Sequence, residues 1–212
     1  MDNASRSERS RNAALEAAIA IIARDGPGRL TLDAIARESG LSKGGVMHQF
    51  RTKEAVLKAL LERQLGHFEE FSTRYMAKVS ATSVNPNLAT QLATIREAAS
   101  SPNSAALALV AAMVENPRLM ALPREREAER MAAIRDEATD PDLAMLRWAG
   151  AMGLLLSSLF GMSPLGKEEH QRLFARLLDD SQWVGLTQPA PPRTVKSGTV
   201  AVAKAASRPK RA

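Results

Sequence analysis

The strongest constraint on the fold is the regular spacing of helix starts and stops along the chain. Three times a helix-capping residue is followed by proline, which suits the first position of a helix because no backbone N–H is needed there. Between such boundaries apolar residues recur every three or four positions, and strand-like alternation of useful length is absent. The sequence therefore predicts an all-α protein of about nine helices. The three capping pairs are Ser101-Pro102, Asn116-Pro117 and Asp140-Pro141.

Four well-bounded helices are predicted in the first part of the chain. The first ends at residues 25–28, whose sequence Asp-Gly-Pro-Gly breaks helices. Each of the next three follows a Ser or Thr that suits the N-cap position. These three helices are predicted at 32–39, 42–50 and 53–76, with Thr31, Ser42 and Thr52 as caps, and later ones at 88–99, 103–115, 118–138, 141–160 and 167–182.

Composition divides the chain into three parts. Residues 1–52 and 53–184 are predicted to form an N-terminal and a C-terminal helical domain. Residues 185–212 are rich in Pro, Ala, Ser and Lys, which predicts a disordered tail. The six basic residues of this tail equal the formal net charge of +6, and without them 23 basic residues face 23 acidic ones. The charge of the whole chain is therefore no evidence that its folded part binds an anion.

Several classes of protein are excluded by the residues that are missing. Without cysteine, the chain has no disulfide, no zinc finger and no thiol redox switch. Its charged N-terminal sequence lacks the apolar core of a secretory signal. The longest apolar stretch, around residues 149–160, contains Gly and Ser and is too short to span a bilayer. We therefore expect a cytoplasmic protein.

Three residues between positions 36 and 46 have the spacing of a helix-turn-helix. In that motif a small residue lets the second helix cross the first, a glycine turns the corner, and a branched apolar residue closes the core. Ala36, Gly40 and Val46 occupy these places. Gly44 and Gly45 lie near the start of the second helix, where the lack of a Cβ lets the backbone approach phosphates and base edges. A tight crossing of the two helices is the alternative explanation for these glycines.

Residues 30–62, LTLDAIARESGLSKGGVMHQFRTKEAVLKALLE, resemble the DNA-binding domain of the TetR/AcrR family of bacterial transcriptional regulators. The resemblance begins near residue 10 and is carried by the capped second helix, the Ser-Lys-Gly start of the third and the Thr-Lys-Glu entry to the fourth. It implies a homodimer that binds double-stranded DNA, with a variable helical C-terminal domain for a small effector. The family's recognition helix commonly ends in Tyr-Tyr-His-Phe. Residues 47–50, Met-His-Gln-Phe, lack both tyrosines, so we expect a different operator.

The predicted DNA contacts fall into two groups. The hydroxyl groups of Thr31 and Ser42 at helix starts are expected to reach phosphates, and the family resemblance adds Lys53, whose alternative is a solvated position. Side chains of the third helix are expected near base edges, where Met47 suits a thymine methyl, His48 a phosphate or guanine, and Gln49 an adenine. The predicted contacts are Thr31, Ser42, Lys43, Gly44, Gly45, Met47, His48, Gln49 and Lys53.

No catalytic constellation, cofactor motif or metal-ligand set is recognisable, and we predict no enzyme activity. The three histidines form no Glu-x-x-His pair, which argues against a di-iron carboxylate bundle. His67 and Glu70 lie three residues apart on the fourth helix and are expected to be a solvated pair rather than a metal site. The charged segment 123–130 is likewise expected to be a solvated helix face.

The C-terminal half holds the candidates for effector binding and dimerisation. Six of the nine methionines lie there, and this adaptable side chain belongs either to an ordinary core or to an apolar cavity for a small, apolar or amphipathic effector. The small-residue-rich segment 149–161, together with 172–178, fits a dimer interface, whereas a buried central helix is the alternative. The predicted ligand contacts are Leu109, Met113, Met120, Met145, Trp148 and Met152.

The sequence thus favours a ligand-responsive transcriptional regulator, with repression expected from the family resemblance. Two alternatives stay open. One is an all-helical small-molecule-binding protein or enzyme whose helix-turn-helix is vestigial. The other is a non-specific DNA binder that relies on the basic tail and loses affinity steeply with salt.

Overall fold

The computed structural model describes residues 3–100, 106, 110, 113 and 116–188. This part of the chain contains eight bounded α-helices and four short 3₁₀ helices, and the predicted all-α fold is confirmed. The helix predicted at 103–115 falls almost entirely outside the described residues, as does the tail from residue 189. The α-helices are α1 (Asn3–Asp25), α2 (Leu32–Ser39), α3 (Lys43–Gln49), α4 (Lys53–Val79), α5 (Pro86–Ser100), α7 (Ala121–Glu137), α8 (Pro141–Leu159) and α9 (Lys167–Leu178). The 3₁₀ helices are η1 (Pro27–Arg29), η2 (Pro117–Met120), η3 (Asp180–Gln182) and η4 (Val184–Leu186).

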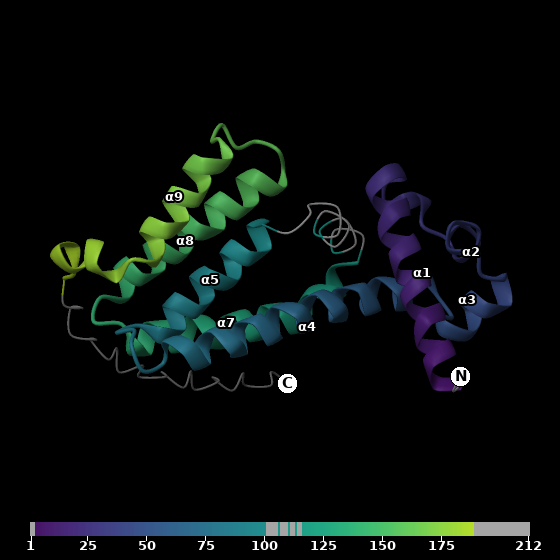
Figure 1. Cartoon of the computed structure of the whole chain (residues 1–212), viewed down its shortest axis with the longest axis horizontal. Helices are drawn as coiled ribbons and strands as arrows, with labels where there is room; N and C mark the ends of the chain where they lie inside the picture. The colour runs from purple at the N-terminus through teal and green to yellow at the C-terminus, as the bar shows by residue number, and fades with distance from the viewer. Residues whose placement is uncertain (1–2, 101–105, 107–109, 111–112, 114–115, 189–212) are drawn as a thin grey trace, which may run out of the picture.

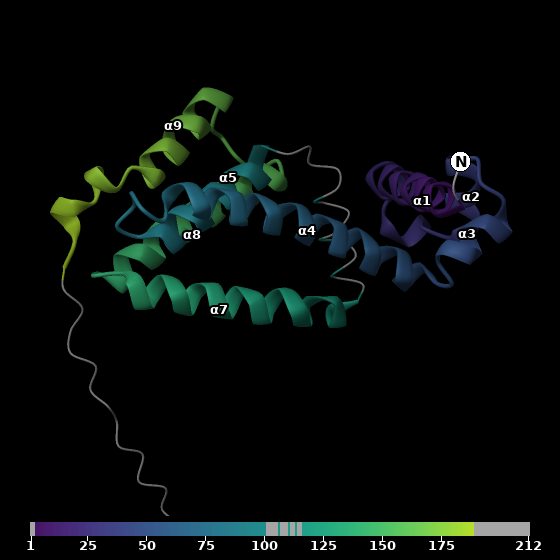
Figure 2. The same ribbon diagram turned by 60° about the horizontal axis from the view of Figure 1, so that its bottom comes forward.

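The helices form two groups that share one long connecting helix. Helices α1, α2 and α3 gather at one end of the molecule, and α5, α7, α8 and α9 gather at the other, with α4 running between them (Figure 1). Figure 2 separates α7 from α4, which overlap in the first view. Each group has its own core of buried apolar side chains. Within the described residues, no helix is both long enough and apolar enough to cross a bilayer.

The core of the N-terminal group is built around the turn between α2 and α3. Val46 and Ile35 are fully buried, and Ala36 is buried beside them. Gly40 ends α2 with a φ of 69°, a left-handed conformation that glycine adopts without strain. The roles predicted for Ala36, Gly40 and Val46 are therefore confirmed.

The predicted N-caps also hold the helix starts of this group. The hydroxyl oxygens of Thr31, Ser42 and Thr52 each accept a hydrogen bond from the backbone N–H three residues later, at 3.0 to 3.1 Å. Such a cap satisfies one of the N–H groups that a helix start leaves without a partner. The starting residues of α2, α3 and α4 are thus defined locally by short-range bonds.

In the C-terminal group, a buried arginine ties α8 to the end of α9. The Arg147 side chain is only 5% exposed. It donates to the carbonyl of Leu177 at 3.1 and 2.7 Å and to Asp180 Oδ1 at 2.8 Å. Its guanidinium also lies over the ring of Trp183, 5.4 Å from the centroid. A buried charge is stable only with such partners. These bonds hold the end of α9 and the start of η3 against α8.

Several predicted boundaries differ from the structure; α5, for example, begins at Pro86 rather than at 88, and α7 begins at Ala121 rather than at 118. Helix α4 continues to Val79, beyond the predicted end at 76. The helix predicted to reach 182 ends at Leu178, because Asp179 turns extended and its carboxylate accepts the Ser181 N–H at 3.1 Å, which starts η3. The predicted tail begins at 185, but η4 covers Val184–Leu186, and the Gln188 N–H donates to Asp140 at 2.8 Å.

Candidate nucleic-acid interface

The N-terminal part of α3 presents an open backbone. A Cβ on Gly44 would meet no atom within 4 Å, and a Cβ on Gly45 would meet only Ser42 Oγ, at 3.2 Å. Neither glycine is therefore needed to let a second helix pack closely, and the packing alternative is not supported. The open space instead permits a close approach by a molecule outside the chain.

The side chains of α3 divide into a buried and an exposed set. Val46 is fully buried and Phe50 nearly so, and both belong to the N-terminal core. Lys43 and His48 are exposed, and Met47 is 47% exposed, which is unusual for a large apolar side chain. The exposed set coincides with residues predicted to lie near base edges.

One predicted contact is paired with an acid on the neighbouring helix. Lys43 Nζ lies 3.0 Å from Asp33 Oδ1, and both side chains are more than half exposed. An exposed ion pair of this kind contributes little to stability. It does place a carboxylate beside the ammonium group that is predicted to face DNA.

Two further predicted contacts also have partners inside the chain. Lys53 Nζ donates to the Pro27 carbonyl at 2.8 Å, which fastens η1 to the start of α4. Gln49 Nε2 donates to Ser7 Oγ in the second turn of α1, at 3.0 Å. An ammonium group and an amide have more than one donor, so neither bond prevents a contact with DNA.

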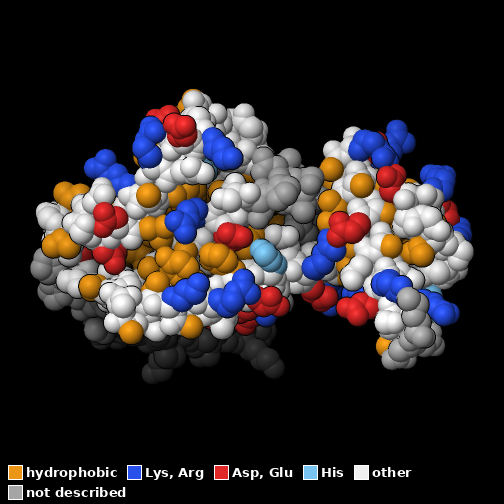
Figure 3. Space-filling view, viewed as in Figure 1, with side chains coloured by type: hydrophobic (Ala, Val, Ile, Leu, Met, Phe, Trp, Pro, Cys, Tyr) orange, Lys and Arg blue, Asp and Glu red, His pale blue; other side chains and the backbone are white. Residues whose placement is uncertain are grey.

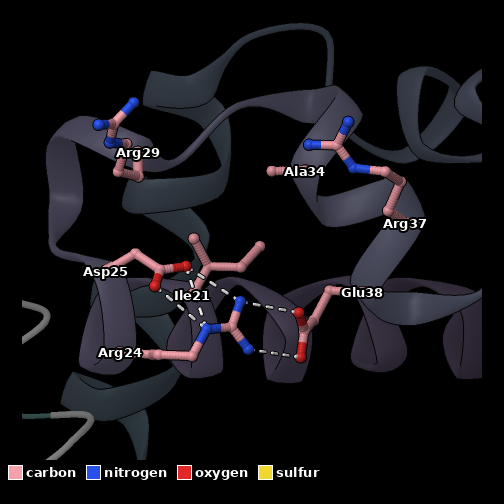
Figure 4. Close-up of a pocket in the computed structure, with 7 residues that line it drawn as sticks. All are labelled: Ile21, Arg24, Asp25, Arg29, Ala34, Arg37 and Glu38. Atoms are coloured by element: carbon pink, nitrogen blue, oxygen red, sulfur yellow. Dashed lines mark hydrogen bonds and ion pairs between the residues drawn. The ribbon is translucent and has the colours of Figure 1, made fainter.

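The C-terminal end of α1, η1 and α2 enclose a charged hollow of about 530 Å³ (Figure 4). At its base Arg24 bonds both Asp25 and Glu38, each at 3.0 Å. The hydrogen bond with Glu38, and to a smaller extent the one with Asp25, raises the pKa of this arginine above its usual range. Arg29 and Arg37 border the same hollow and are exposed. For these two the described part of the chain provides no hydrogen-bond or ion-pair partner, so their charges are available to an external anion.

The surface around the N-terminal group carries mixed charge on the face drawn in Figure 3. Basic side chains lie around its rim, with acidic side chains between them. Binding of DNA at this end would therefore depend on the placement of individual residues more than on one continuous basic patch.

Sequence reasoning did not single out Ser7, Arg29 or Arg37. For Arg29 a local signal existed, because the residue lies two positions before the helix cap Thr31. Arg37 could have been placed on the outer face of α2 by helical spacing from Ala34. For Ser7 there was no signal, since its contact with Gln49 spans 42 residues.

The predicted ligand contacts are only partly described, and the four whose side chains are described divide between the two cores. Met145, Trp148 and Met152 are partly buried against the C-terminal core, whereas Met113 packs against the N-terminal core. Leu109 and the side chain of Met120 lie outside the described residues. One hollow in the C-terminal group, of about 380 Å³, is lined by other residues, among them Leu88, Arg147 and Trp183. The cavity prediction stays a prediction.

The histidine weighed as a metal ligand has a different neighbour from the one considered. His67 Nε2 lies 4.0 Å from Glu97 on α5, while Glu70 lies 3.9 Å from Arg74. Among the described residues, no group of three or more His, Asp or Glu side chains is arranged to hold a metal ion.

Two family models match this chain. Residues 14–60 match the model for bacterial regulatory proteins of the tetR family, and residues 85–182 match a C-terminal domain described as tetracyclin repressor-like. The first match contains the whole helix-turn-helix, and the second contains α5, α7, α8 and α9. No curated protein sequence matches the chain.

Solved structures with the same arrangement of helices are distant in sequence. A TetR-family transcriptional regulator from Bordetella parapertussis 12822 is 21% identical, with a TM-score of 0.58 over 79% of this chain and 91% of its own. The multidrug binding protein EbrR, complexed with malachite green, is also 21% identical, with a TM-score of 0.58 over 80% and 98%. A protein from Saccharomonospora viridis, described as a transcriptional regulator in complex with choline, is 17% identical, with a TM-score of 0.61 over 87% and 100%.

Proposed function

Because this chain belongs to the TetR family of DNA-binding transcriptional regulators, we propose that it is a ligand-responsive repressor that binds a pseudo-palindromic operator as a homodimer. The observation that carries this proposal is the open backbone at Gly44 and Gly45, next to the exposed side chains of α3. A regulator of this family is not an enzyme, so the enzyme alternative is set aside. Its place of action is the cytoplasm, where bacterial DNA lies.

In the proposed complex, α3 enters the major groove. Lys43, Met47, His48 and Gln49 lie near base edges, with Gly44 and Gly45 allowing the backbone to come close. Thr31, Ser42 and Lys53 lie near phosphates. The free charge of Arg29, two residues from Thr31, supports an additional phosphate contact on the same side.

An exposed apolar stripe on α8 supports the proposed dimer. Leu146 is 68% exposed, Leu156 41% and Phe160 49%, and the glycines at 150 and 153 are exposed between them. Their spacing of three and four residues places them on one face of the helix. Apolar side chains exposed in a row favour a protein partner, and a two-fold axis would place the recognition helices about one DNA turn (~34 Å) or a multiple apart.

The C-terminal group is the proposed effector site. Trp148 Nε1 is buried and has no acceptor among the described residues, so a ligand that accepts a hydrogen bond there would relieve that cost. Relatives bound to malachite green and to choline support a small organic effector. A ligand that switches the population from 1:99 to 99:1 must favour one state by about 5.5 kcal/mol. Helix α4, which joins both groups, is the proposed route of that change.

Selection of genome fragments tests the proposal. Purified protein at about 150 mM salt is incubated with sheared DNA of the source genome, beside a chain truncated after Gln188. We expect one enriched palindrome that both forms retain. Enrichment lost with the tail would favour the tail-driven binder, and no enrichment would contradict sequence-specific binding. A reporter gene behind the selected operator then tests repression.

A further inference from the structure

The first three turns of α1 reach the far end of the recognition helix. Helix α1 begins at Asn3, whereas the match to the family model begins at residue 14. Within this leading segment, Ser7 Oγ accepts the hydrogen bond from Gln49 Nε2 at 3.0 Å, and the bond is partly buried. Arg11 lies over the ring of Phe50, 4.7 Å from its centroid. Two side chains of α1 thus contact the last residue of α3 and the residue after it.

The contact with Ser7 matters because of the chemistry of the glutamine amide. A glutamine side chain without a partner moves among several rotamers, and its amide group moves with it. Bidentate pairing with adenine needs the carbonyl and one N–H side by side. When the other N–H donates to Ser7, the amide group is held at one place at the end of α3, and its carbonyl and remaining N–H stay available together.

We propose that Ser7 is a positioning residue for DNA reading. It holds the Gln49 amide at one place beside α1, so the base preference at the end of the recognition helix depends on a hydroxyl group in α1. This inference rests on the proposed function, because it requires α3 to lie in the major groove. It adds a specificity determinant that lies outside the helix-turn-helix itself.

The test compares base preference among matched variants. Affinities are measured for the selected operator and for its single base-pair variants. Ser7→Ala should lower discrimination at one base pair of each half-site by about three- to tenfold, the worth of one hydrogen bond. Ser7→Thr keeps the hydroxyl and should retain the wild-type preference. Ser10→Ala is the control, because Ser10 Oγ bonds the Arg6 carbonyl of its own helix.

A double-mutant cycle separates positioning from a merely structural role. In the Gln49→Ala background, Ser7→Ala should cause no further loss of discrimination, because the amide that it positions is gone. A destabilised domain would instead lower affinity for all sequences alike. The side-chain amide signals of Gln49, followed by ¹⁵N NMR without DNA, should move on Ser7→Ala and stay in place on Ser10→Ala.

The outcomes distinguish this inference from the proposed function. A wild-type chain that selects no operator overturns the proposed function. A wild-type chain that selects one, while Ser7→Ala keeps the same discrimination at every position, overturns only the inference. An equal loss on Ser7→Ala with and without Gln49 would also overturn it, since Ser7 would then act independently of that amide.

Discussion

The N-terminal and C-terminal groups of helices place their charged side chains differently. In the N-terminal group the ion pairs lie at the surface. Lys43 pairs with Asp33 and Arg63 with Glu16, with side chains between 38% and 67% exposed. Pairs of this kind are screened by water and salt and add little to stability. Their charges can therefore be exchanged for those of a DNA backbone at small cost to the fold.

In the C-terminal group, charged side chains act inside the structure. Arg147 is almost fully buried on Leu177 and Asp180. Glu137 of α7 accepts the backbone N–H groups of Asn87 and Leu88 at the start of α5, at 3.0 and 2.8 Å. Polar contacts that are buried or partly buried, as these are, are costly to break because the remaining partner loses its hydrogen bond. A charge change should thus alter DNA binding in one group and stability in the other.

The largest expected effect is on DNA binding, through Gly44→Glu. The new side chain has free space in the molecule, so the domain should fold as before. Its carboxylate would face the phosphates, and a like charge at an interface costs several kcal/mol. We expect operator affinity to fall at least about 100-fold, measured by fluorescence anisotropy.

Gly66→Glu serves as the matched control, because this glycine of α4 is also exposed and open. It should bind the operator like the wild type. Equal binding by Gly44→Glu and the wild type would contradict the assignment of α3 as the recognition helix. Loss of cooperative thermal unfolding in Gly44→Glu would show that the glycine serves the fold instead.

The second effect is on stability, through Arg147→Met. The substitution keeps an apolar stem but removes the donor of the Leu177 carbonyl and of Asp180 Oδ1, while Ser83 still donates to Asp180 Oδ2. We expect a loss of about 2–3 kcal/mol in the free energy of unfolding, somewhat less than for a fully buried pair because Asp180 remains partly exposed. Urea denaturation followed by circular dichroism measures it.

Arg63→Met tests the other side of the comparison. Its exposed pair with Glu16 should contribute no more than about 1 kcal/mol. Equal losses in the two variants would show that burial does not distinguish the charges of the two groups.

Sequence reasoning predicted the features that depend on residues close together in the chain. The caps Thr31, Ser42 and Thr52 act over three residues, and Gly40 acts at its own position, so local pattern was enough to predict them. The apolar spacing likewise predicted the helices themselves. These features depend on neighbours within one or two helical turns.

Contacts between distant residues were not predictable in this way. Two hydrogen bonds depend on how whole helices cross. Gln49 donates to Ser7, and Arg147 donates to the Leu177 carbonyl. The helix predicted to reach 182 stopped at Leu178 because Asp179 caps η3, a competition that periodicity alone does not register. Methionine content indicated an adaptable interior but not which side chains would share a cavity.

A smaller effect on DNA binding is expected from Asp33→Asn. Without its acidic partner, Lys43 is free to approach DNA, and one negative charge is removed from the interface. We expect operator affinity to rise about three- to tenfold and the salt dependence to steepen by about one charge per subunit. Binding isotherms between about 50 and 200 mM salt measure the operator affinity and its salt dependence.

Glu16→Gln is the control for this change, since it removes one acid from an exposed pair on α1 and α4. Its operator affinity should stay close to that of the wild type. A lower affinity of Asp33→Asn would contradict the idea that Asp33 restrains Lys43, and would favour a role for the carboxylate itself in reading a base.

The smallest expected effect is an acid dependence at the start of α8. The N–H groups of Gln188 and Leu143 donate to Asp140 and hold the pKa of its carboxyl below the ordinary value of 3.8. A lowered pKa in the folded state means that ionised Asp140 adds stability above about pH 4, and that this contribution is lost as the pH falls through the lowered pKa. Between about pH 5 and 2.5, the thermal unfolding midpoint should therefore fall more steeply in the wild type than in Asp140→Asn. The amide oxygen of the variant can still accept one hydrogen bond, but the amide does not titrate. Parallel curves for the two proteins would show that the carboxylate charge does not help to hold Gln188 against the start of α8. The contrast between the two groups would then rest on Arg147 and Glu137 alone.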